Sequence, residues 1–260
     1  MYNVFQIDGK VKKAIELPQI FNAQISMPLI RRAAIAEMTR KLQPQGHDLL
    51  AGMRTTAAYF GAMSSYRTGR HMGIAIRPRE KLGGGTQGKV KRIPSAVKGK
   101  RAHPHVVEKI LIERMNAKEY QKAIASAIAS TKFDVQSSTV KSSPIIVGDE
   151  IESIKKTKQL VDVLKKLGIE NYIESGHDPS IRKGIRRNSR ARHFKKVLLF
   201  VFSKDVEAKK AARNIPGVDV CDVNSLTVSA LAPGGNPGRI SIWSESAISA
   251  IESAINKYKL

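Results

Sequence analysis

The sequence predicts an α/β protein with a mainly parallel sheet that is covered by helices on both faces. Two observations lead to this class. Short apolar runs alternate with segments of helical periodicity through the C-terminal half of the chain. In addition, 42% of the 260 residues are hydrophobic, which is enough to build a substantial core. A third observation adds a long extended basic loop, because the segment from Leu50 to His105 has almost no periodic apolar pattern.

The N-terminal region predicts a hairpin followed by a helix. Apolar residues over Val4–Ile7 lead into the turn-forming pair Asp8-Gly9, and a second apolar stretch reaches Ile15 and Leu17. Apolar residues then recur at helical spacing over Leu29–Leu42. We therefore expect a helix that begins near Pro28 and ends before Pro44.

Regular structure returns after the basic segment. Asn116 is a favourable helix cap, and Glu119 three positions later gives the arrangement of a capping box. The remaining elements are expected as strands over Pro144–Val147, Ile169–Ile173, Val197–Phe202, Val218–Cys221 and Arg239–Trp243, and as helices over Leu160–Leu167, Asp205–Asn214 and Ser244–Lys257.

The segment between Leu50 and His105 carries charge of nearly one sign. Glu80 is its only acid, and many glycines separate its cations. Such a segment buries too little apolar surface to offset the entropy of ordering it, so we expect a polyanion, RNA, to order it. The domain prediction is a globular α/β domain from residues 1–44 and 105–260 and an inserted loop over 45–104. Its candidate RNA-binding residues are Arg54, Arg67, Arg70, His71, Arg77, Arg79, Lys81, Lys89, Lys91, Arg92, Lys98, Lys100, Arg101 and His103.

A second basic run without any acid interrupts the globular part. A solvated surface is the ordinary explanation of a charge run, but surfaces that serve solubility alone carry mixed signs. The formal charge of the whole chain is +23, which attracts nucleic acid. We therefore add a second set of candidate RNA-binding residues: Arg182, Lys183, Arg186, Arg187, Arg190, Arg192, Lys195 and Lys196.

The sequence does not favour an enzyme. Gly83–Lys89 has the spacing of a phosphate-binding P-loop, but Val90 replaces the Ser or Thr that binds magnesium, and no apolar strand precedes it. A nucleotide-dependent enzyme is therefore a minor alternative. No nucleophile stands near a base, and His103 and His105 lack carboxylates that would complete a metal site. We expect no cofactor and no metal.

A membrane protein is also disfavoured. The longest apolar run, Val197–Phe202, is too short to cross a bilayer, and neither basic segment forms a basic amphipathic helix. Cys221 is the only cysteine, which fits a reducing compartment. The N-terminus lacks the pattern of a signal peptide. We expect a cytoplasmic protein.

Several motifs occur in order along the chain: Leu17-Pro18 with Phe21, Gly52–Thr55, Phe60-Gly61, Thr68–Arg70, Arg92–Pro104, Leu231–Arg239 and Ser244–Ala247. Together they resemble one family, the universal ribosomal protein four of the large subunit in its archaeal and eukaryotic branch. The similarity covers essentially the whole chain. The pair Ser26-Met27 departs from the arginine found before the first helix in many relatives, which leaves one RNA contact in question.

The resemblance implies a three-layer α/β/α domain and a loop that passes through 23S-type rRNA to the wall of the nascent-peptide exit tunnel. It implies three partners: large-subunit rRNA, neighbouring large-subunit ribosomal proteins, and the nascent peptide at the loop tip. A free regulatory RNA-binding protein that acts on its own message is the alternative. The tip corresponds to about Arg67–Arg77, around Thr68, Gly69, Arg70, His71, Met72 and Gly73.

Overall fold

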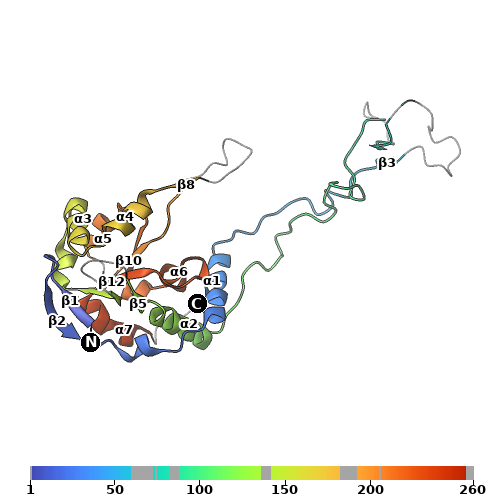
Figure 1. Ribbon diagram of the computed structural model, residues 1–260. Coiled ribbons are helices and arrows are strands. Elements are labelled where there is room, and N and C mark those ends of the chain that lie inside the picture. The colour runs from blue at the N-terminus through green and yellow to red at the C-terminus, as the bar shows by residue number, and fades with distance from the viewer. Residues whose placement is uncertain are drawn as a thin grey trace. The chain divides into compact units, whose positions relative to one another are not determined.

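The computed structural model describes residues 2–59, 73, 75–81, 88–135, 142–181, 192–204 and 206–255. The chain divides into two compact units (Figure 1). The first unit combines Met1–Lys41 with Ile112–Leu260, and the second unit is Leu42–Leu111. The boundaries expected for the inserted loop, 45 and 104, fall inside the second unit and stay a prediction.

A six-stranded sheet forms the centre of the first unit, in the order β11-β10-β12-β7-β1-β2. All neighbours are parallel except β2, which runs antiparallel to β1 because the turn at Gly9, with a φ of +78°, reverses the chain. The mixed, mostly parallel sheet confirms the α/β class. The strands are β1 (Tyr2–Phe5), β2 (Val11–Ile15), β7 (Ile145–Val147), β10 (Leu198–Phe202), β11 (Val218–Asp222) and β12 (Ile240–Ser244).

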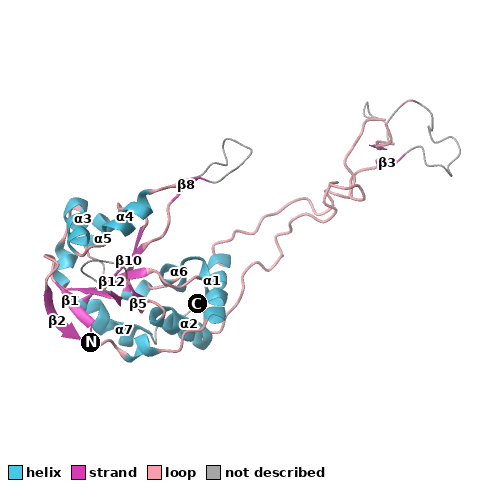
Figure 2. Cartoon of the chain, in the orientation of Figure 1, coloured by secondary structure: helices cyan, strands magenta, loops and turns pink. Residues whose placement is uncertain are grey.

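Helices cover both faces of this sheet (Figure 2). Alternation along β10 directs Leu199 and Val201 to one face and Leu198, Phe200 and Phe202 to the other. The first face packs against α1 (Met27–Thr39), α2 (Ala117–Ala129), α6 (Val228–Leu231) and α7 (Glu245–Ile255). The second packs against α3 (Thr157–Lys166), α4 (Glu170–His177) and α5 (Ala208–Arg213).

One carboxylate ties together the helices of the first layer. Glu37 of α1 accepts hydrogen bonds from the backbone N–H groups of Val228 (2.8 Å) and Ser229 (2.9 Å), at the start of α6. It also accepts from the hydroxyl of Tyr120 in α2, at 2.7 Å. These donors at a helix start lack partners within the helix, so Glu37 satisfies them and fixes α6 against α1 and α2.

A second link holds the end of α1 beside the segment that enters α2. The Thr39 hydroxyl donates to the carbonyl of Ala36 at 3.0 Å and accepts from the backbone N–H of Glu113 at 3.1 Å. The helix ends at Thr39, short of the expected Leu42, and Met38 and Leu42 are exposed instead of completing the apolar stripe.

Two sequence expectations are wrong. Residues Ile169–Ile173 do not form a strand: Glu170 begins helix α4, and Ile169 and Ile173, four positions apart, both face the core. The Asn116 side chain makes no capping bond at the start of α2, so the capping box does not form. Glu119 forms an ion pair with Arg32 of α1 at 2.7 Å instead.

The second unit contains little regular structure in its described part. Strand β3 (Ala58–Tyr59) pairs antiparallel with β4 (Pro78–Arg79), and Arg79 bridges Val90. Short antiparallel pairs also occur in the first unit: β5 (Phe133–Asp134) with β6 (Ser142–Ser143), and β8 (Ser180–Ile181) with β9 (Arg192–His193). Within the described ranges, no helix is long and apolar enough to cross a membrane.

Candidate nucleic-acid interface

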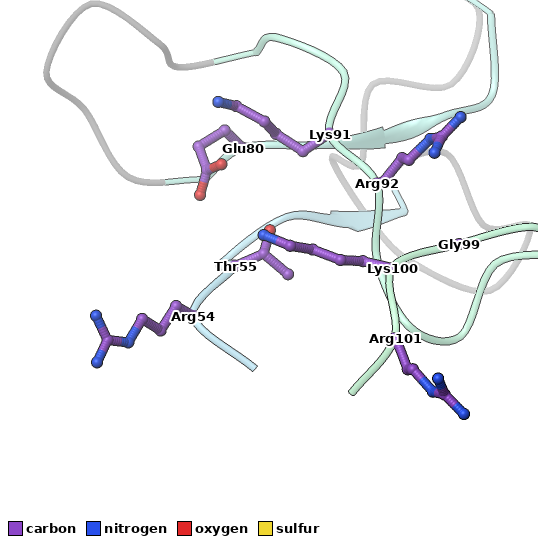
Figure 3. Close-up of a pocket in the computed structure, with 8 residues that line it drawn as sticks. All are labelled: Arg54, Thr55, Glu80, Lys91, Arg92, Gly99, Lys100 and Arg101. Atoms are coloured by element: carbon purple, nitrogen blue, oxygen red, sulfur yellow. The ribbon is translucent and has the colours of Figure 1, made fainter. Parts of the chain in front are cut away.

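A cavity of about 610 Å³ in the second unit gathers side chains of both signs (Figure 3). Five of its eight lining residues are cations, and one is an acid. The cations come from separate parts of the segment: Arg54 lies before β3, and the others follow the bridge at Val90. The lining residues are Arg54, Thr55, Glu80, Lys91, Arg92, Gly99, Lys100 and Arg101.

Backbone hydrogen bonds bring these segments together. Glu80 N–H donates to the carbonyl of Lys89 at 3.0 Å, and Lys91 N–H donates to that of Pro78 at 3.0 Å. The chain then turns back, because Lys100 N–H donates to the carbonyl of Ile93 at 3.2 Å. The antiparallel register places Glu80 near Lys91, and the turn returns Lys100 toward them.

Glycine is required at position 99 for this turn to close. A Cβ atom there would lie 1.9 Å from the carbonyl oxygen of Ile93 and 2.6 Å from that of Ala96. Both atoms belong to the backbone, so neither can move aside cheaply. Ile93, which is 5% exposed, is one of the few buried apolar side chains described in this unit.

Glu80 is held by a neutral partner. Its Oε1 atom accepts from the backbone N–H of Thr56 at 3.2 Å and from the Thr56 hydroxyl. Across the described ranges, Glu80 forms no ion pair. The carboxylate therefore joins two segments of the unit without neutralising any cation by direct contact.

Only one of the five cavity cations has an ion-pair partner among the described residues. Arg54 forms an ion pair with Asp48 at 3.0 Å. The other four are exposed, and none has an ion-pair partner among the residues that the structure describes. Unpaired cations that surround a hollow attract phosphate groups, since each can displace a condensed counterion from a nucleic acid.

The remaining predicted residues of this unit lie around the cavity. Arg79 supports the fold of the unit, since its guanidinium donates to the carbonyls of Gly88 (3.1 Å) and Ala75 (2.9 Å). Arg77 donates to the carbonyl of Ile76 at 2.9 Å. Exposed positions outside the cavity lining are held by Lys81, Lys89, Lys98 and His103.

Many predicted site residues fall outside the described residues. These are Arg67, Thr68, Gly69, Arg70, His71, Met72, Arg182, Lys183, Arg186, Arg187 and Arg190. The glycine-rich motif is likewise outside them over 83–87. On its two flanks, however, Glu80 pairs with Lys89 in an antiparallel arrangement, and no helix follows Lys89 as a P-loop requires.

The end of the second basic run has a defined position. Lys195 is exposed, whereas Lys196 forms an ion pair with Asp219 of β11 at 3.0 Å. Asp219 also accepts from the buried guanidinium of Arg239 at 2.8 Å. The backbone of Arg192 lies in β9.

Two neighbouring positive charges control the protonation of Asp219. Burial alone would raise the pKa of this carboxyl, but the charges of Arg239 and Lys196 and their hydrogen bonds outweigh burial and hold it below 3.8. Burial lowers the pKa of Arg239, although the neighbouring Asp219 opposes this effect. Sequence reasoning missed this pair because Asp219 lies in β11 and Arg239 directly precedes β12, and the two residues share no motif.

The carboxyl edge of the parallel sheet, where α/β proteins commonly bind ligands, is occupied by the chain's own side chains. Glu152 accepts from the hydroxyls of Ser203 (3.3 Å) and Ser246 (3.2 Å). Asp149 accepts from the backbone N–H of Ser246 at 2.9 Å. The cavity of the second unit is therefore the stronger candidate site.

Comparison with known proteins identifies the family. Residues 15–254 match the model of the "Ribosomal protein L4/L1 family". Proteins named large ribosomal subunit protein uL4 are similar along their whole length. The one from Methanococcus aeolicus is 40% identical over 258 residues, which cover 95% of this chain and 97% of the relative.

More distant archaeal relatives give the same result. The protein of the same name from Methanocaldococcus jannaschii is 38% identical and covers 96% of this chain and 97% of its own length. The protein of this name from Haloquadratum walsbyi is 35% identical, and the match covers 95% of this chain and 97% of the relative. Both exceed what chance similarity over a whole chain gives, and the chain therefore belongs to the ribosomal protein L4/L1 family.

Proposed function

We propose that this protein is a structural constituent of the large ribosomal subunit in the cytoplasm, where it binds 23S-type rRNA and contacts neighbouring ribosomal proteins. The observation that carries the proposal is full-length similarity to proteins named large ribosomal subunit protein uL4. The cavity in the second unit, where four of five cations have no ion-pair partner among the described residues, supplies a physical means of binding RNA. The role is structural and not catalytic. The comparisons favour it over a free regulator of its own message.

The mechanism of binding is neutralisation of phosphates by residues on the second unit. Arginine forks bridge phosphates from separate strands, and lysines act as point charges that displace counterions. Release of counterions drives association, while ordering of the basic segment opposes it. The predicted residues of the second basic run, from Arg182 to Lys196, add further phosphate contacts from the first unit.

We further propose that residues 45–104 act as an extended loop that passes between rRNA helices to the exit tunnel. The resemblance of Gly52–Thr55 and Arg92–Pro104 to the two ends of that loop in the family supports this assignment. The tip, Arg67–Arg77, would face the nascent peptide.

A salt series tests RNA binding. The triple replacement of Lys89, Lys91 and Arg92 by Ser should weaken binding to purified archaeal 23S-type rRNA and reduce its salt dependence. Loss of three phosphate contacts lowers the log–log slope by about two. A matched control replaces three exposed lysines near α3, at positions 155, 156 and 158, and removes the same charge. Equal slopes for the triple variant and the wild type would contradict the role of the cavity region.

Incorporation into subunits tests the ribosomal role itself. The protein should co-sediment with large subunits at a salt concentration that strips loosely bound proteins. Deletion of Thr68–Gly73 should leave this association intact while it alters nascent-chain stalling in ribosome profiling. If the deletion variant melts normally but fails to enter subunits, the tip anchors assembly and the tunnel assignment is wrong.

A further inference from the structure

The presence of Glu80 in a cavity for phosphate requires an explanation. A carboxylate repels phosphate, so a site that binds only phosphates is weakened by it. The tie to Thr56 does not need a negative charge, because a neutral glutamine oxygen would accept the same two hydrogen bonds. Glu80 also forms no ion pair with a cavity cation in the described part of the chain, so neutralising those cations does not explain its charge. The charge therefore points to a ligand group that donates a hydrogen bond.

One oxygen of Glu80 is available for such a donor. Both bonds from Thr56 go to Oε1, and among the residues that the structure describes Oε2 has no hydrogen-bond partner. Glu80 is only partly buried, so Oε2 can be reached from the cavity that this residue lines. An ionised carboxylate has room for further bonds and makes stronger ones than a neutral acceptor.

The flanking side chains place phosphate next to this acceptor. Lys91 and Lys100 line the same cavity as Glu80. Figure 3 shows these three side chains extending to one side of the ribbon, while Arg92 and Arg101 extend to the other. A ligand in the cavity thus meets two ammonium groups and one carboxylate, which suits a phosphate with a hydroxyl close to it.

We propose that this cavity recognises the sugar of RNA: Lys91 and Lys100 hold a backbone phosphate, and Oε2 of Glu80 accepts a hydrogen bond from the adjoining 2′-hydroxyl. This inference rests on the proposed function and deepens it. The 2′-hydroxyl is the donor that RNA carries next to every phosphate and that DNA lacks. Base donors lie on the far side of the sugar from the phosphate that the lysines hold.

The test uses the full-length protein and three tetranucleotides of the same base: uridine, deoxyuridine and 2′-O-methyluridine. The 2′-O-methyl form keeps the RNA sugar pucker but has no donor. Binding is followed by NMR through the amide signals of Thr56 and Gly99, so that only ligand in the cavity is counted. The wild type should bind the uridine form about tenfold more tightly than the 2′-O-methyl form, the size of one hydrogen bond to a charged group.

Variants then locate the donor contact. Glu80→Gln keeps the acceptor for Thr56 but removes the charge, so the preference for the uridine form should fall to less than about threefold. The same variant should bind the 2′-O-methyl form more tightly, because repulsion of the phosphate is gone. Glu108→Gln, at an exposed acid of the same unit outside the cavity lining, is the matched control and should keep the preference.

Two results would overturn the inference. A preference that persists in Glu80→Gln and in Glu80→Ala would place the donor contact elsewhere. If tetranucleotides shift no cavity signals while 23S-type rRNA still binds, the sugar-reading site is wrong and the proposed function stands. If rRNA itself does not bind, the proposed function falls.

Discussion

Replacement of Asp219 by Asn should destabilise the first unit by leaving a buried guanidinium without its counter-charge. The Arg239 side chain is 2% exposed, and it donates to Asp219, to the carbonyl of Ala230 at 2.7 Å and to that of Leu198 at 2.6 Å. The replacement keeps the size of the side chain and removes its charge. The carbonyls of Ala230 and Leu198 still accept hydrogen bonds from Arg239 in the variant, so the guanidinium stays buried.

The expected loss is about 2 kcal/mol in the free energy of unfolding. Breaking a fully buried ion pair costs about 3–5 kcal/mol, because one charge is left uncompensated. The Asp219 side chain is 34% exposed, and that of its other partner, Lys196, is 56% exposed. Water therefore screens part of the interaction, and the loss should be smaller than for a fully buried pair.

The effect should depend on pH with a defined sign. The folded-state pKa of Asp219 lies below its ordinary value of 3.8. A carboxyl of this kind contributes stability that is fully present above 3.8 and is lost as pH falls through the folded-state pKa. The difference between wild type and Asp219→Asn should thus be constant near neutral pH and shrink below about pH 4.

Urea unfolding measured by fluorescence gives this difference directly. Trp243 is the only tryptophan and is fully buried in β12, so its signal reports the first unit. Asp178→Asn, at an exposed acid, should change stability by less than about 0.5 kcal/mol. A difference between wild type and Asp219→Asn that stays unchanged into the acid range would refute the assignment of the effect to this carboxylate.

Three further outcomes are expected. Tyr120→Phe should lower the free energy of unfolding by about 1 kcal/mol, as the hydroxyl no longer donates to Glu37. Burial and that hydrogen bond raise the pKa of Tyr120 above its usual 10, so the wild type should lose more stability than the variant as pH rises beyond about 10 in urea titrations. Gly99→Ala should weaken binding to 23S-type rRNA, because the new Cβ forces the turn away from the Ile93 carbonyl. The stability of the first unit should not change. Equal affinity for wild type and variant would show that the turn tolerates a Cβ at this position. Limited proteolysis without RNA should cut first between Gly46 and Pro104, and added rRNA should suppress the cuts; protection before RNA is added would count against the extended loop.

The fold was predictable where apolar runs are long and continuous. The run Val197–Phe202 gave the clearest indication of a buried strand, and β10 has a parallel neighbour on each side, β11 and β12. Ile169–Ile173 was misassigned because a short apolar stretch fits a strand and a buried helix face equally well. The capping box at Asn116 does not form, and Glu119 instead forms an ion pair with Arg32, a residue that is distant in sequence.

The sequence predicted the positive charge of the candidate RNA-binding site but not how its side chains are arranged in space. The one-signed composition identifies the basic segment, and Glu80 stands out as its sole acid. The pairing of Glu80 with Thr56 follows from the antiparallel return of the chain, which no local pattern encodes. Gly99 likewise looked like one of many glycines until its closeness to the Ile93 carbonyl was known.

The link between Thr39 and Glu113 has a consequence for how this chain could change during evolution. It pins the two ends of the intervening residues 40–112 within one hydrogen bond of each other, inside the first unit. For a flexible connection, each doubling of length adds only about 0.6 kcal/mol to the entropy of closure. The insertion can therefore lengthen or shorten with little penalty to the sheet domain, and its reach can follow the depth of the rRNA that we propose it enters.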